Sequence, residues 1–329
     1  MKASINRELV RVGGQIIQAS TAASANDWRA LVARFIAEED IAVSSRQLYT
    51  RTLTQFFKYL ERTGKLFAFY NKILDRTDIL TYKDTLLAQG LSVLTVGSYI
   101  VVVRKFFAAL EAQKIYPNIA KGIKTPKKDK GFKKMHLTDT ESHDFLTLCK
   151  DNYSLRDYAI ANLILRTGLR TIEVVRADIA DITFKGGKRV LMVWGKGHDS
   201  KDNFVVLTEK AYLPIKEYLA TERKGAKAGE PLFTSESIRN KGSRLTTRTI
   251  SGICKDGLRG IGLDGKEYTA HSLRHTTACA ILAHSNGDIT AAQDVLRHAS
   301  PVTTQIYVAS IKDEMRIQKA PEALLDAAF

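Results

Sequence analysis

The sequence predicts a mainly α-helical protein of two domains with one small three-stranded antiparallel sheet. The length of 329 residues exceeds what one hydrophobic core usually supports. Apolar residues recur at helical spacing over most of the chain, and only one region of short β-branched runs interrupts them. With 44% hydrophobic and 26% charged residues, the composition is that of a folded globular protein and excludes whole-chain disorder.

Charge and cysteine content narrow the class of protein. Lys and Arg number 50 against 35 Asp and Glu, a formal net charge of +15, which favours nucleic acid as a partner. The three cysteines have no CxxC spacing, so neither a disulfide framework nor a zinc ribbon is expected. The N-terminus lacks a continuous apolar segment and we find no long uncharged apolar stretch, which predicts a cytoplasmic, nucleoid-associated protein without membrane contact.

The first part of the chain is predicted to be a helical bundle. Residues 1–25 are weakly periodic and are expected to form a flexible arm, and residues 26–120 form the bundle. The expected helices span 28–38, 46–62 with Ser44-Ser45 as the cap, 75–89, and 92–113.

A lysine-rich segment, 121–134, separates the two predicted domains. It contains Pro126, two glycines and almost no apolar residues, so it is expected to be an extended linker. Basic residues outnumber acidic ones on both sides of it. Two basic domains on a basic linker could close around a nucleic-acid duplex; the alternative is a solvated linker between unrelated domains.

Residues 135–329 form the second predicted domain, with 311–329 as a C-terminal tail. A helix is expected over 156–167, and helices resume at Thr208. Between them, three runs rich in β-branched and aromatic residues are divided by glycine-containing turns, which predicts a three-stranded meander. The expected strands are 181–184, 189–194 and 203–207.

Four short polar segments of this domain could hold a phosphate group. Each alone has an ordinary structural explanation, because a glycine turn is usually only a turn and a tyrosine among apolar residues is usually packed. The segments are TGLRTIE at 167–173, WGKG at 194–197, HSLRH at 271–275 and RHASPVTTQIY at 297–307.

His271 and His275 stand four positions apart, a spacing that suits two metal ligands on one helix face. No glutamate follows the first histidine, and Arg274 would repel a cation. We therefore predict no metal site, and His275 is expected to be a structural core histidine.

Together and in this order, the four segments resemble the tyrosine recombinase, or phage integrase, family. The resemblance implies a two-domain DNA clamp, built from a helical core-binding domain and a tyrosine recombinase catalytic domain. It also implies the catalytic positions, with Glu173 in support: Arg170, Lys196, His271, Arg274, His298 and Tyr307.

Two departures from the family pattern stand out. Arg297 replaces the usual glycine before the histidine, and residues 198–203 lack the frequent Lys-x-Arg run. The second departure leaves open whether Lys196 or Lys201 is the lysine that reaches the active site.

The implied chemistry suits these residue types. Guanidinium groups stabilise the charge that grows on a phosphodiester during displacement, and a tyrosine becomes a nucleophile when cations or a base such as His271 assist its deprotonation. A lysine can protonate the leaving oxygen. No metal, ATP or other cofactor is expected; Gly260–Gly265 matches GxGxxG, but no buried strand precedes it.

The resemblance implies a site-specific recombinase or integrase of a mobile genetic element. It would act on double-stranded DNA as a homo-tetramer, and be a monomer or weak oligomer when free; accessory proteins remain open. The alternatives are a type IB topoisomerase-like DNA relaxase, a catalytically silent DNA-binding protein and a histidine-based metal enzyme.

Further DNA contacts are predicted at basic residues of the linker and of loops in the second domain. Each is expected to touch phosphate, with a solvated surface charge as the alternative. They are Lys124, Lys127, Lys128, Lys130, Lys201, Arg239, Lys241, Arg244 and Arg248.

Overall fold

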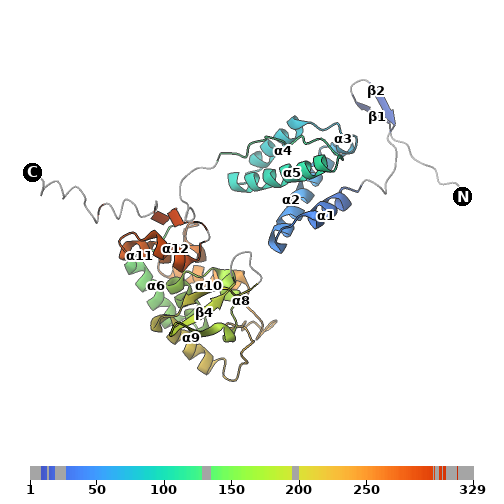
Figure 1. Ribbon diagram of the computed structural model, residues 1–329. Coiled ribbons are helices and arrows are strands. Elements are labelled where there is room, and N and C mark those ends of the chain that lie inside the picture. The colour runs from blue at the N-terminus through green and yellow to red at the C-terminus, as the bar shows by residue number, and fades with distance from the viewer. Residues whose placement is uncertain are drawn as a thin grey trace, which may run out of the picture. The chain divides into compact units, whose positions relative to one another are not determined.

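The chain forms two compact units, Met1–Lys130 and Gly131–Phe329, here called unit 1 and unit 2 (Figure 1). The computed structural model describes residues 9–12, 15–18, 27–127, 135–194, 200–298, 300, 304, 305, 307, 308 and 317. The predicted fold class is confirmed, since the described residues are mostly helical with one three-stranded antiparallel sheet.

Unit 1 is a helical bundle around an aromatic core. Trp28 stacks on Phe57 with ring centroids 4.8 Å apart, and Phe56 meets Tyr82 edge-on at 5.0 Å. Its described helices are α1 (Trp28–Glu38), α2 (Val43–Arg62), α3 (Leu66–Tyr70), α4 (Arg76–Ala88) and α5 (Val93–Ala112). An antiparallel hairpin of β1 (Leu9–Val12) and β2 (Gln15–Gln18) precedes them; the sequence did not predict it.

Local capping explains where most of these helices begin. Asp75 and Asp78 form a capping box at the start of α4, and the Ser92 side chain accepts the Thr95 N–H at the start of α5. Both helices begin within one residue of their predicted starts. The predicted Ser44-Ser45 cap of α2 was wrong. That helix begins at Val43, because the Ala42 carbonyl already accepts the N–H of Ser45 at 2.9 Å.

Helix α5 is long and apolar enough to cross a membrane, with a mean hydropathy of 1.7 over 18 residues. This differs from the expectation that no such segment exists. Ile100, Val103 and Phe106 of α5 are completely buried in the unit 1 core. The apolar composition is therefore that of a core helix, and gives only weak support for a membrane span.

Unit 2 surrounds helix α7 with helices and a small sheet. Strands β3, β4 and β5 form the predicted antiparallel meander, in which Leu191 pairs with Ile182 on one side and Val205 on the other. The elements are α6 (Asp139–Asn152), α7 (Leu155–Thr167), α8 (Thr171–Arg176), η1 (Ile179–Asp181), β3 (Ile182–Lys185), β4 (Lys188–Val193), β5 (Asn203–Val206), α9 (Glu209–Thr221), α10 (Thr247–Gly260), α11 (Ala270–His284) and α12 (Ile289–Leu296).

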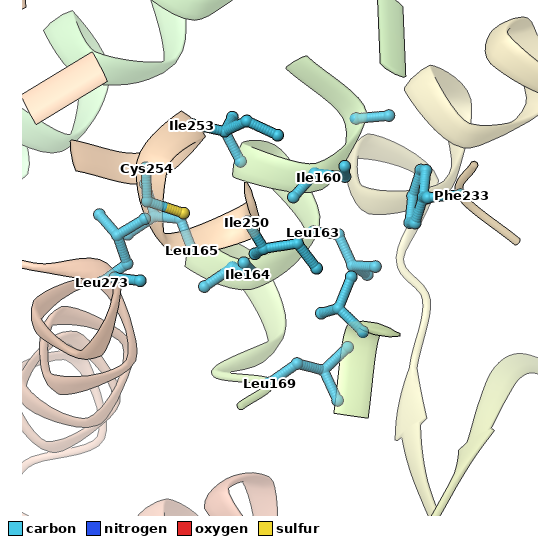
Figure 2. Close-up of a cluster of buried hydrophobic side chains, with 14 of the residues drawn as sticks. Ile160, Leu163, Ile164, Leu165, Leu169, Phe233, Ile250, Ile253, Cys254 and Leu273 are labelled. Atoms are coloured by element: carbon cyan, nitrogen blue, oxygen red, sulfur yellow. The ribbon is translucent and has the colours of Figure 1, made fainter. Parts of the chain in front are cut away.

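The core of unit 2 fixes the ends of three helices. Ile160 and Ile164 of α7 lie in one buried cluster with Ile250 of α10 and Leu273 of α11 (Figure 2). Burying each such side chain contributes about 1.5–3 kcal/mol. Because Leu273 precedes Arg274, this packing also holds the Arg274 backbone against the end of α7.

A smaller cluster holds Tyr307. Tyr307 belongs to one buried cluster with Cys279 and Leu282 of α11 and with Leu296 at the end of α12. Helix α11 begins at Ala270, because a capping box at Thr269 closes its first turn. As a result, His271 and Arg274 both lie on this helix.

Candidate active site

Arg170 lies in the sharp turn between α7 and α8. Gly168 ends α7 in the left-handed conformation with φ +61°, which glycine adopts without strain. Glu173 of α8 reaches back to Arg170: its Oε2 accepts the backbone N–H at 2.8 Å, and its Oε1 accepts from Nη1 at 2.8 Å. The Arg170 side chain, 29% exposed, is thus held but still accessible.

Arg274 is almost completely buried, at 1% exposure. Its Nη1 donates to the carbonyl of Gly168, and its Nη2 donates to that of Leu296 at 2.6 Å. Burial and the charges of Arg170 and Arg297 lower the pKa of Arg274 to about 10, so the group stays protonated at neutral pH. Arg274 therefore joins α11 to the ends of α7 and α12.

His298 follows α12 and is 8% exposed. Its Nδ1 lies 2.9 Å from the Thr304 hydroxyl. Burial and the charges of Arg274 and Arg170 lower the pKa of His298 to about 4, so the imidazole is neutral at pH 7. A Thr304 hydroxyl that donates to Nδ1 places the ring proton on Nε2, where it can be donated to a ligand.

Tyr307 lies beside these cations and is 5% exposed. Its ring is 5.8 Å from that of His298, and the two planes differ by 11°. Burial raises the pKa of Tyr307, whereas the charge of Arg274 and a hydrogen bond with it act in the opposite direction. Burial is the larger effect, so the phenol is protonated at neutral pH.

A cleft of about 1330 Å³ opens onto this cluster. Arg170, Arg297 and His298 line it, together with Trp194 and Phe204 from the region of the sheet. His271 is exposed on α11, and its charge contributes to the low pKa of His298. Such a cationic cleft can hold one phosphate and place it next to a phenol oxygen.

The structure brings together five of the six predicted catalytic residues: Arg170, His271, Arg274, His298 and Tyr307. The sixth, Lys196, lies outside the described residues. The Lys201 ammonium contacts Asp178 at 2.7 Å and also Asp181, and these bonds outweigh burial, so the pKa of Lys201 is raised.

The predicted DNA contacts fall into different environments. Arg244 donates to Asp178 and to the carbonyl of Val175, so it shares with Lys201 an ion-pair cluster within unit 2. Lys128 and Lys130 lie outside the described residues. Five others are exposed and stay predictions: Lys124, Lys127, Arg239, Lys241 and Arg248.

His275 is completely buried, as a structural histidine would be, and its ring lies 4.9 Å from that of Tyr307. The ligand atoms of His275, His136 and Cys279 lie within 4.8 Å of one another. This group could hold a soft cation, and it is a different group from the His271/His275 pair considered in the sequence.

Arg297 is a site residue that the sequence did not predict. Its side chain is 6% exposed, and its Nη2 donates to Glu173 Oε2 at 2.9 Å. The one signal in the sequence was the arginine itself, at a position where glycine is usual.

Residues 136–314 match the model of the phage integrase family. The tyrosine recombinase XerC of Caldanaerobacter subterraneus subsp. tengcongensis is 36% identical over 183 residues, which cover 55% of this chain and 49% of that protein. The chain thus matches about half the length of that relative. The tyrosine recombinase XerD of Oceanobacillus iheyensis is 29% identical over 285 residues, 85% of this chain and 92% of that protein.

A solved structure of a recombinase has a fold similar to that of this chain. The XerH site-specific recombinase, crystallised with palindromic difH substrate as a post-cleavage complex, is similar with a TM-score of 0.70. The match covers 88% of this chain and 83% of that chain at 20% sequence identity, and so supports a shared fold.

Proposed function

Because the chain belongs to the phage integrase family of tyrosine recombinases, we propose that it is a site-specific DNA recombinase that cleaves and rejoins strands through a 3′-phosphotyrosyl intermediate. One observation carries the proposal: Arg170, Arg274 and His298 converge on Tyr307 from separate elements. Together they supply positive charge, a neutral hydrogen-bond donor and a nucleophile around one cleft.

The phosphate site works by fixed charge. In-line displacement concentrates negative charge on the non-bridging oxygens of the phosphodiester. Arg170 and Arg274 present planar donors whose heads are already held by protein atoms, so little reorganisation is needed when the phosphate binds. Neutral His298 donates a further hydrogen bond from Nε2. In other phosphoryl-transfer enzymes a bound Mg²⁺ stabilises this charge, whereas here side chains of the protein itself do so.

The proposed reaction needs no further reactant, because every bond that breaks is matched by one that forms. The Tyr307 oxygen loses its proton to His271 and bonds to phosphorus, and the P–O5′ bond breaks. The 5′-oxygen takes a proton from Lys196, leaving a 3′-phosphotyrosine and a free 5′-hydroxyl. The phosphoester is conserved, so rejoining is the same step in reverse and consumes no ATP.

Double-stranded DNA is the proposed partner, which the basic charge of +15 supports. Four protomers are proposed to assemble on two duplexes and to exchange strands. The XerH complex supports the choice of DNA, because that recombinase is bound to its difH substrate.

A plasmid assay tests the function. The DNA site is first selected by binding the full chain to fragments of its parent element, and two copies are placed on a supercoiled plasmid. We expect recombinant circles in the presence of EDTA and without ATP. Relaxed topoisomers without recombinants would instead favour the topoisomerase-like alternative, and binding without any strand cleavage would favour a silent DNA-binding protein.

A further inference from the structure

Arg297 occupies a backbone position that suits glycine better than arginine. It ends α12 with φ +54° and ψ +48°, the left-handed region in which a Cβ is sterically unfavourable. Its N–H caps the helix by bonding to Asp294 O at 3.1 Å, which glycine would do equally well. The backbone therefore gives no reason for a side chain here.

The Arg297 side chain is buried and firmly bound. Nη1 donates to Val295 O at 2.6 Å and Nη2 to Glu173 Oε2 at 2.9 Å. Nε is buried and has no hydrogen-bond partner among the described residues. A buried arginine with an unsatisfied N–H is costly, so its interaction with Glu173 must offset that cost.

Glu173 is shared between two arginines. It is 5% exposed and contacts the Arg170 guanidinium through Oε1 and that of Arg297 through Oε2. Burial raises the pKa of Glu173, but the charges of Arg297 and Arg170 outweigh it, and the carboxylate is ionised. Paired with Arg170 alone, this carboxylate would cancel the charge that the phosphate needs and would repel the phosphate itself.

We infer that Arg297 is a positioning residue of the phosphate site: it neutralises Glu173, so that Glu173 orients Arg170 without cancelling its charge. Arg170, Arg297 and Glu173 line the cleft, and with the buried Arg274 beside them the three guanidinium groups and one carboxylate leave a net charge of +2 at the site. The inference rests on the proposed function and assigns to Arg297 a role that the usual glycine cannot perform.

The test is a double-mutant cycle in single-turnover cleavage of the selected DNA, with the DNA dissociation constant and Tm measured for each variant. We expect Arg297→Gly to slow cleavage about tenfold or more, with DNA affinity nearly unchanged because many phosphates contribute to it. Arg297→Lys should restore part of the rate. In a Glu173→Gln background, where no carboxylate needs neutralising, Arg297→Gly should cost less than about threefold.

Asn286→Gly is the matched control, since Asn286 is also left-handed, with φ +57°, and exposed in unit 2. It should leave the cleavage rate unchanged. Wild-type cleavage rates in Arg297→Gly, or an equal loss in both backgrounds, would overturn the inference while leaving the proposed function intact.

A readout without DNA separates this inference from the proposed function. NMR titration of His298 in the full chain should show a higher pKa in Arg297→Gly, because a nearby positive charge is lost, and a lower one in Glu173→Gln. This titration tests the inference even if the wild type never cleaves DNA. If neither variant changes the pKa of His298, the electrostatic role of Arg297 is refuted.

Discussion

At the level of single residues, Arg170 and Arg274 each carry a positive charge but differ in their hydrogen-bond partners and in their exposure. Arg274 is bonded to two backbone carbonyls at 1% exposure, so its loss would disturb the fold as well as the site. Arg170 is bonded to one side chain and partly exposed. Arg170 is therefore the residue at which chemistry can be tested with the least effect on stability.

Arg170→Lys should lower the cleavage rate about 100-fold or more, since lysine keeps the charge but lacks the planar fork. DNA binding should stay within a fewfold of the wild-type affinity. Single-turnover cleavage and a filter-binding titration measure the two quantities. Arg259→Lys, at an exposed arginine paired with Asp264, is the control; equal rates in the two variants would remove Arg170 from the site.

His298 makes stability depend on pH in a defined direction. Its pKa is about 4 in the folded protein and about 6.5 in an unfolded chain. Between these values the unfolded chain binds more protons, so the free energy of unfolding falls as the pH drops from 6.5 towards 4. His298→Gln cannot titrate and should lose less stability over this window in urea unfolding; parallel curves would contradict the assignment.

The sequence predicted the site residues that a family pattern marks, and missed the one set by tertiary contact. Arg170, Arg274, His298 and Tyr307 lie in three of the four motifs whose order could be recognised. The partner of Arg297 is Glu173, which lies 124 positions earlier in the chain. No local rule predicts such a contact, although the unusual arginine signalled that the local structure would differ.

At the scale of elements, α10 packs against α6 through glycine. A Cβ on Gly257 would lie 2.7 Å from Phe145 Cε2 and 3.0 Å from Cys149 Sγ, whereas one on Gly252 of the same helix would meet nothing within 4 Å. Close approach of α6 and α10 thus requires glycine at Gly257, and also at Gly260, where a Cβ would lie 2.8 Å from Leu148 Cδ1 of α6.

Gly257→Ala should destabilise unit 2 by about 1–3 kcal/mol through overpacking. Gly252→Ala should stabilise it by about 0.5–1 kcal/mol, because alanine favours the helix. Urea unfolding of both variants measures the difference. Similar effects of the two substitutions would show that α6 and α10 are not in close contact.

Local signals decided which elements could be predicted. The capping box at Asp75 and the Ser92 cap gave α4 and α5 their correct starts. Helix α3 has only five residues and no cap; its residue Phe69 stacks on Tyr116 at 5.2 Å. An element stabilised by contacts with distant residues leaves no periodic pattern, which is why α3 was not predicted.

At the scale of the whole molecule, both units carry exposed lysines and arginines, and the affinity for DNA should fall steeply with salt. Each phosphate contact contributes about −0.9 to the slope of log K against log salt concentration. Replacing Lys124 and Lys127, both exposed, by Gln should reduce the slope by about 2.

Salt titrations of DNA binding by fluorescence anisotropy measure this slope. Lys224→Gln, at an exposed lysine outside the predicted contacts, should leave it closer to the wild-type value. A slope that does not change in the Lys124 and Lys127 variant would assign these lysines to the solvated surface.

The most direct test of the mechanism is to identify the covalently bound residue. Nicked DNA carrying the selected site traps the cleaved strand, because the short fragment beyond the nick diffuses away. Denaturing electrophoresis and peptide mass spectrometry should find a 3′-phosphotyrosine at Tyr307, and no adduct with Tyr307→Phe. An adduct that forms undiminished in Tyr307→Phe, or that maps to another residue, would contradict the central claim.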